Sequence, residues 1–174
     1  MNVAEIKTND IANGEGVRTS LFVSGCRHCC PDCFNAMAWD FSYGKPFTEE
    51  TEKEILDSLK PMWIAGLSIL GGEPFEPENQ KTLLKFIKKF KAQYPNKTIW
   101  CYSGFTFEEI TGRKPSRAYT DISAELLKTI DILVDGRFEK EQKNITLKFR
   151  GSENQRVIDV QKTLKQNEII LYLN

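Results

Sequence analysis

The sequence is organised around an apolar run that leads directly into a cysteine-rich loop, Leu21-Phe22-Val23-Ser24-Gly25-Cys26-Arg27-His28-Cys29-Cys30-Pro31-Asp32-Cys33-Phe34-Asn35. Four of the five cysteines in the 174-residue chain lie within this stretch. Thiols at such density in one loop are typical of metal binding or redox chemistry, because they cannot all be buried in a core. The stretch therefore predicts a functional site immediately after a first strand over residues 18–23.

Outward from this stretch, strand-like and helical patterns alternate along the chain. Further strands are predicted at 66–70, 97–102 and 132–134, and helices at 51–59, 79–90, 106–110 and 123–130. This alternation is typical of βαβ units and a parallel sheet. We expect a single α/β domain spanning residues 1–174, built as a partial, open parallel (β/α) barrel of about four to six units. A doubly wound open sheet is the alternative, and 145–149, 157–160 and 168–173 are additional strand-like segments.

Each of the four main predicted strands ends in a small or polar cluster. The clusters are Ser24-Gly25-Cys26, Gly71-Gly72-Glu73, Ser103-Gly104 and Asp135-Gly136. In parallel α/β folds the carboxyl ends of the strands face the ligand. We therefore expect the four clusters to converge on one site.

The composition is that of an ordinary globular protein, and its charge balance limits the classes of partner that we expect. Lysine plus arginine and aspartate plus glutamate balance at 24 each, so no long-range field favours nucleic acid or an anionic membrane. No apolar stretch approaches the length of a membrane span or a signal peptide. We expect a cytoplasmic protein, where thiols stay reduced and clustered cysteines bind metal.

The cysteine spacing can be interpreted in two ways. Two abutting Cys-x2-Cys units, Cys26/Cys29 and Cys30/Cys33, suggest a zinc site, although adjacent ligands reach tetrahedral corners poorly. The triple Cys26, Cys30 and Cys33 instead forms C-x3-C-x2-C, which suits three corners of a cubane cluster and leaves one iron without a protein ligand. Cys29 is then a spare thiol.

The C-x3-C-x2-C motif after the first strand, followed by Gly71-Gly72-Glu73-Pro74 after the second, resembles the radical S-adenosylmethionine superfamily. The resemblance implies that Cys26, Cys30 and Cys33 bind a [4Fe-4S] cluster whose fourth iron is chelated by S-adenosyl-L-methionine. It also implies that Gly71, Gly72 and Glu73 hold the methionine end of that cofactor. Glycines allow close backbone approach and the glutamate offers an acceptor for an ammonium group.

Further segments make the resemblance more specific, to the activases of glycyl-radical enzymes. Segments 13–18 and 21–26 resemble the start of these activases, and segments 100–105, 133–138 and 150–155 resemble activating proteins of anaerobic ribonucleoside-triphosphate reductase. The implied reaction is reductive cleavage of S-adenosyl-L-methionine and formation of a glycyl radical on the large reductase subunit. A low-potential donor such as flavodoxin would supply the electron. An activase for another enzyme, such as pyruvate formate-lyase, and a structural zinc-binding adaptor are the alternative functions.

The resemblance assigns further roles around the loop. Asp32, Cys33 and Phe34 would line the cofactor, with Phe34 beside the adenine, and no catalytic side chain is expected beyond the cofactor site. Cys101 is interpreted as a packed thiol, and His28 as solvated or adjacent to the cluster without ligating it. Asp135 either faces the cofactor or binds a cation, or it caps a turn. The aromatic segment 39–43 (Trp39, Phe41 and Tyr43) is either an exposed docking rim or core.

Overall fold

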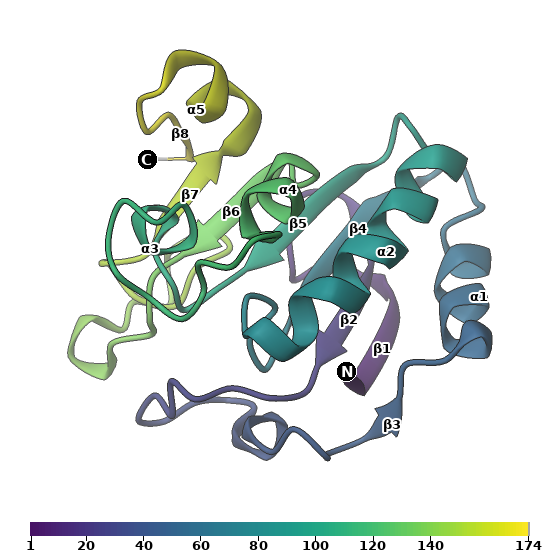
Figure 1. Cartoon of the computed structure of the whole chain (residues 1–174), viewed down its shortest axis with the longest axis horizontal. Helices are drawn as coiled ribbons and strands as arrows, with labels where there is room; N and C mark the ends of the chain where they lie inside the picture. Colours follow the sequence, from purple (N-terminus) through teal and green to yellow (C-terminus); the bar gives the residue numbers. More distant parts are fainter. Residues whose placement is uncertain (174) are drawn as a thin grey trace.

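The computed structural model describes residues 1–173, and a single eight-stranded sheet runs through it (Figure 1). The strand order across the sheet is β3-β1-β2-β4-β5-β6-β7-β8. The strands are β1 (Asn2–Asp10), β2 (Val17–Val23), β3 (Lys45–Pro46), β4 (Ile64–Gly71), β5 (Thr98–Tyr102), β6 (Ile132–Asp135), β7 (Arg156–Asp159) and β8 (Leu171–Leu173). The helices are α1 (Glu49–Ser58), α2 (Pro77–Gln93), α3 (Phe107–Ile110), α4 (Ser123–Lys128) and α5 (Val160–Gln166), with short 3-10 turns η1 (Ala36–Trp39) and η2 (Lys140–Gln142).

The centre of the sheet is parallel and its edges are antiparallel. Strands β2, β4, β5 and β6 pair in parallel and in chain order, whereas β1 and β3 on one side and β7 and β8 on the other pair antiparallel. The expectation of a parallel sheet is thus correct for four strands and wrong for the other four. Helices form the three crossovers between the parallel strands, fewer than the four to six units expected, and α5 lies between the antiparallel strands β7 and β8.

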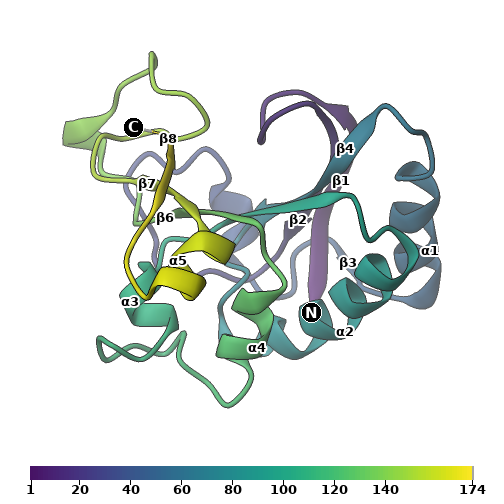
Figure 2. The ribbon, with the colours of Figure 1, turned by 90° about the horizontal axis from the view of Figure 1, so that it is seen from above.

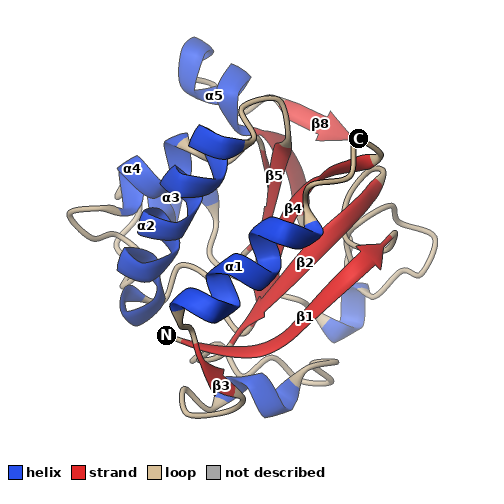
Figure 3. Ribbon diagram, turned by 90° about the vertical axis from the view of Figure 1, so that its right-hand side faces the viewer, coloured by secondary structure: helices blue, strands red, loops and turns tan. Residues whose placement is uncertain are grey.

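The helices that connect the parallel strands lie on one face of the sheet (Figure 3). Seen from above, the sheet is strongly twisted (Figure 2), and β3 and β8 are its two edge strands. Successive residues of a strand point to opposite faces, so Leu133 joins the main core beneath the helices while Val134 joins a small cluster around Trp100 on the other face. A doubly wound sheet reverses its strand order and carries helices on both faces, so this alternative does not describe the molecule.

Two local expectations were wrong, and one strand gave no sequence signal. Residues 145–149 were expected to form a strand but form turns and bends. Residues Lys45–Pro46, where the sequence pattern indicates a turn after Tyr43-Gly44, pair with β1 as strand β3. Strand β1 went unpredicted because register shifts after Val3 and after Lys7 interrupt its alternation of apolar and polar residues. Within residues 1–173, none of the helices combines the length and the apolar character needed to cross a bilayer.

Candidate cofactor site

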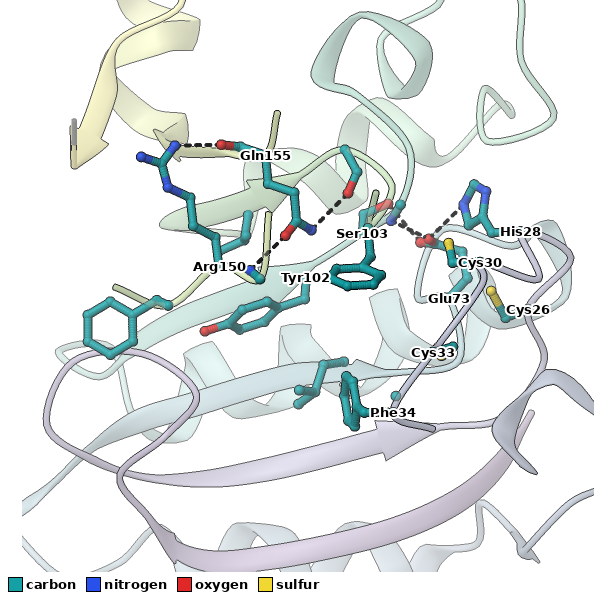
Figure 4. A pocket seen from close by; sticks show the side chains of 18 of the residues that line it. Cys26, His28, Cys30, Cys33, Phe34, Glu73, Tyr102, Ser103, Arg150 and Gln155 are labelled. Atoms are coloured by element: carbon teal, nitrogen blue, oxygen red, sulfur yellow. Dashed lines mark hydrogen bonds and ion pairs between the residues drawn. The ribbon is translucent and has the colours of Figure 1, made fainter. Parts of the chain in front are cut away.

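A cavity of about 540 Å³ opens at the carboxyl ends of the parallel strands (Figure 4). Residues from all four predicted clusters line it: Cys26 after β2, the Gly71-Gly72-Glu73 segment after β4, Ser103 and Gly104 after β5, and Gly136 after β6. The predicted convergence of the strand ends on one site is confirmed. Opposite the cysteines, the wall is formed by the segment 143–155, including Arg150 and Gln155.

Three of the four loop cysteines line this cavity. Cys26, Cys30 and Cys33 are half-buried and belong to its wall, whereas Cys29 is exposed, has a left-handed backbone (φ 49°) and does not. Burial and the nearby Glu73 carboxylate raise the pKa of Cys26 to about 12, and burial raises the pKa of Cys30. Because metal binding replaces the thiol proton, these thiols favour either a proton or a cationic metal centre.

The cysteines do not converge as ligands of a single ion. Across residues 1–173, no group of three or more histidine, cysteine, aspartate or glutamate side chains is close enough to hold one metal ion. A closed zinc site requires four ligands within bonding distance of one centre, whereas a cubane cluster distributes its cysteines over separate irons. A closed set of zinc ligands is thus not present among residues 1–173, and the thiols that line the cavity are those of the triple Cys26, Cys30 and Cys33.

Glu73 is buried and ties three strand ends together. Its Oε1 accepts from the Phe75 amide and the Ser103 hydroxyl, both at 2.8 Å. Its Oε2 accepts from the Gly104 amide at 2.7 Å and from His28 Nε2 at 3.1 Å. Four donors occupy the lone-pair positions of a carboxylate. Glu73 therefore organises the cavity wall itself, a role that the sequence did not indicate.

The two glycines before Glu73 permit a close backbone approach. Gly71 has φ 111°, and a Cβ there would lie 2.6 Å from the backbone of Val23. A Cβ on Gly72 would lie 2.6 Å from the Gly25 carbonyl oxygen. The segment after β4 and the start of the cysteine loop thus pack backbone against backbone, which only glycine allows.

The last two predicted cofactor residues lie at the mouth of the cavity. Asp32 lines it with a left-handed backbone (φ 57°), and its carboxylate pairs with Lys140 at 2.7 Å. The Lys140 ammonium lowers the pKa of Asp32. Phe34 is 83% exposed and contributes its ring to the cavity wall, so a large apolar side chain borders the opening without any covering partner among the described residues.

Unpartnered polar atoms around the cavity indicate that it suits a polar ligand. Trp39 Nε1, Tyr102 Oη and His28 Nδ1 are buried without a hydrogen-bond partner among residues 1–173, and all three side chains belong to the cavity wall. A buried polar group without a partner costs free energy, so such groups are normally satisfied by protein, water or ligand. Their gathering beside three cysteines fits a site for a cluster and a polar cofactor.

The structure also places Cys101, Asp135 and the aromatic segment 39–43. Cys101 is buried in the main core, as expected. Asp135 accepts from Arg156 Nε at 2.9 Å and from the Phe107 amide at 2.7 Å, so it caps α3 and does not face the cofactor side. In segment 39–43, Trp39, Phe41 and Tyr43 are each half-buried, so neither an exposed rim nor a full core describes them.

Sequence reasoning missed the residues that fix the loop. Of the two placements expected for His28, solvated or beside the cluster site, the structure shows the side chain 2% exposed in the cavity wall, where its ring packs edge-on against Phe105 with centroids 4.3 Å apart. Glu76 is fully buried and accepts hydrogen bonds from Arg27 and Arg117. A signal was present for Glu76, since a carboxylate three residues after Glu73 and directly before Pro77 occupies a helix start.

Comparison with known proteins identifies the family. Residues 12–158 match the model of the 4Fe-4S single cluster domain. The chain is 41% identical to the anaerobic ribonucleoside-triphosphate reductase-activating protein of Pasteurella multocida over 89% of this chain and 95% of that protein. It is 36% identical to the Escherichia coli K12 protein of the same name (89% and 96%) and 37% identical to that of Enterobacteria phage T4 (90% and 93%). The chain therefore belongs to the 4Fe-4S single cluster domain family and to the anaerobic ribonucleoside-triphosphate reductase-activating proteins.

Proposed function

We propose that this chain activates anaerobic ribonucleoside-triphosphate reductase by generating a glycyl radical on its large subunit. The observation that carries the proposal is the meeting of the C-x3-C-x2-C loop and the Gly71-Gly72-Glu73 segment in one cavity, within a family of reductase-activating proteins. The names of the relatives favour this reductase over pyruvate formate-lyase as the partner.

Three residues are proposed as cluster ligands and five more as cofactor contacts. Cys26, Cys30 and Cys33 would hold a [4Fe-4S] cluster, and Gly71, Gly72, Glu73, Asp32 and Phe34 would surround S-adenosyl-L-methionine, together with the backbone of Cys33. When bound, the cluster and this cofactor supply the one-electron reductive cleavage that gives methionine and a 5′-deoxyadenosyl radical, which removes a hydrogen atom from a glycine α-carbon of the reductase. Three thiolates leave one iron open for the cofactor.

The role proposed for the protein's own residues is to bind and orient the cofactors. The small residues at the strand ends keep the cavity open near the cysteines, and the exposed Phe34 ring borders the entrance where an adenine could stack. No separate catalytic side chain is required, because the cofactors carry the chemistry.

The proposal extends to the whole chain. We infer that residues 1–174 form one radical S-adenosyl-L-methionine domain whose twisted sheet is a partial, open barrel, and that a flavodoxin-like protein reduces the cluster in the cytoplasm. The parallel order of β2, β4, β5 and β6, with helices on one face, supports the barrel.

The test is anaerobic incubation of the iron-loaded protein with the reductase, S-adenosyl-L-methionine and a reductant. We expect the doublet signal of a glycyl radical in electron paramagnetic resonance, and no signal when S-adenosyl-L-methionine is omitted. The same incubation with pyruvate formate-lyase serves as the partner control. A protein that purifies anaerobically with zinc and without iron or sulfide would contradict the proposal.

A further inference from the structure

We propose that Glu76 is a positioning residue that selects which cysteines become cluster ligands. By holding Arg27, it fixes the cysteine loop so that Cys30, and not its neighbour Cys29, faces the cavity. This inference rests on the proposed ligand set of Cys26, Cys30 and Cys33.

The Glu76 carboxylate is buried and forms a two-arginine centre. Its Oε1 accepts from the Arg27 amide at 2.8 Å, and its Oε2 accepts from Arg27 Nη1 at 2.8 Å. Arg117 donates to it from the other side, with Nη2 to Oε1 at 2.9 Å and Nε to Oε2 at 3.0 Å. One carboxylate therefore fixes both the backbone and the side chain of Arg27, which directly follows Cys26.

The segment around Glu76 holds the start of the cysteine loop at almost every residue. The Gly72 amide donates to the Val23 carbonyl at 2.6 Å, and the Glu73 amide donates to the Gly25 carbonyl at 2.8 Å. Asn79 Nδ2 donates to the Ser24 carbonyl at 3.0 Å. In addition, the Glu76 carboxylate accepts hydrogen bonds from Arg27, and the Glu73 carboxylate accepts one from His28. The loop therefore cannot slide along the segment 72–79 without breaking several buried hydrogen bonds together.

The position of this anchor determines the register of the cysteines that follow. Immediately after His28 the chain turns through the left-handed residue Cys29, which places Cys29 outside and Cys30 in the cavity wall. A shift of one residue would exchange the two thiols. Because Cys29 and Cys30 are chemically identical, their backbone positions distinguish them, and these positions follow directly on the anchored residues Arg27 and His28.

The test reads the two thiols separately in the full-length protein. Each variant is loaded anaerobically with ferrous iron and sulfide and then alkylated, and peptide fragmentation measures the label on Cys29 and on Cys30. In the parent we expect Cys29 to be labelled and Cys30 to be protected by the cluster. In Glu76→Gln and Arg27→Ala we expect the Cys29-to-Cys30 labelling ratio to fall about tenfold, the effect of losing one buried charged hydrogen bond.

Glu78→Gln is the matched control, because Glu78 also pairs with Arg27, at 2.5 Å, but on the surface. Its labelling ratio should equal that of the parent. If Glu76→Gln does not fold, as judged by circular dichroism, Arg27→Ala provides the test, because it changes a half-exposed side chain. An unchanged ratio in the folded variants, an equal shift in Glu78→Gln, or complete loss of iron from a folded variant would overturn the selecting role. Absence of iron from the parent would instead contradict the proposed function.

Discussion

The two halves of the cysteine loop are built differently. The anchored half, residues 23–28, is held by the segment 72–79 through backbone and buried carboxylate contacts. The open half, residues 29–34, is mostly exposed. Its contacts include the Asp32–Lys140 pair, a turn in which the Cys33 amide donates to the Cys30 carbonyl, and hydrogen bonds from the Asn35 and Phe138 amides to the Cys33 and Cys30 sulfurs. One proposed ligand lies on the anchored half and two lie on the open half. The protein therefore prearranges one corner of the site, and the other two corners have few contacts to resist adjustment around a cluster.

Replacing the thiols one at a time tests most directly which cysteines of the two halves are ligands. We expect Cys26→Ala, Cys30→Ala and Cys33→Ala each to lose the cluster and S-adenosyl-L-methionine cleavage, because three thiolates are needed for a cluster with one open iron. Iron and sulfide per chain, measured anaerobically, give the result. Cys29→Ala is the control and should keep both. Loss of the cluster in Cys29→Ala with retention in Cys30→Ala would reverse the assignment.

A second prediction concerns the stability that the anchored half contributes. Glu76→Ala should lower the free energy of unfolding by about 2 kcal/mol, because two arginines lose a buried acceptor. Glu78→Ala, which removes only an exposed partner of Arg27, should cost about 0.5 kcal/mol or less. Urea unfolding of the metal-free proteins under reducing conditions measures both. Equal losses would show that the buried carboxylate contributes no more than a surface pair.

Acid should weaken the same contact. Hydrogen bonds from Arg117 and Arg27 outweigh the desolvation of Glu76 and hold the pKa of its carboxyl below the usual 4.5. The unfolded chain therefore takes up this proton first, so the contribution of Glu76 is fully present above pH 4.5 and is lost as the pH falls through 4.5 towards the folded-state pKa. The stability difference between the parent and Glu76→Gln should be constant above this range and shrink within it. Urea midpoints against pH test this, and two parallel curves would contradict it.

The smallest effect is expected on the open half. Lys140→Ala removes the partner of Asp32, and both side chains are more than half exposed. Exposed ion pairs contribute little because water and salt screen them. We expect the urea midpoint of the metal-free protein to stay unchanged, with Lys143→Ala as a matched lysine control. A clear drop confined to Lys140→Ala would show that the open half is fixed before the cluster binds.

The sequence was informative where local pattern determines structure and silent where distant residues decide it. The four parallel strands and their converging ends follow from apolar runs that stop at Gly71-Gly72, Ser103-Gly104 and Asp135-Gly136. Strand β1 did not, because its bulges disrupt the alternation. The pairing of Arg27 with Glu76, 49 residues apart, left no periodic signal. The burial of His28 likewise depends on Phe105 and Glu73, which only the fold brings to it.

The fifth cysteine gives the molecule an internal reporter of global opening. Cys101 is 1% exposed in the middle of the sheet, and burial raises its pKa well above the usual value. Alkylation requires both access and a thiolate, so Cys101 reacts only when strand β5 leaves the core. Its labelling rate in the native protein therefore measures unfolding, while the loop thiols measure cluster occupancy, and one mass spectrum records the two properties on the same molecules.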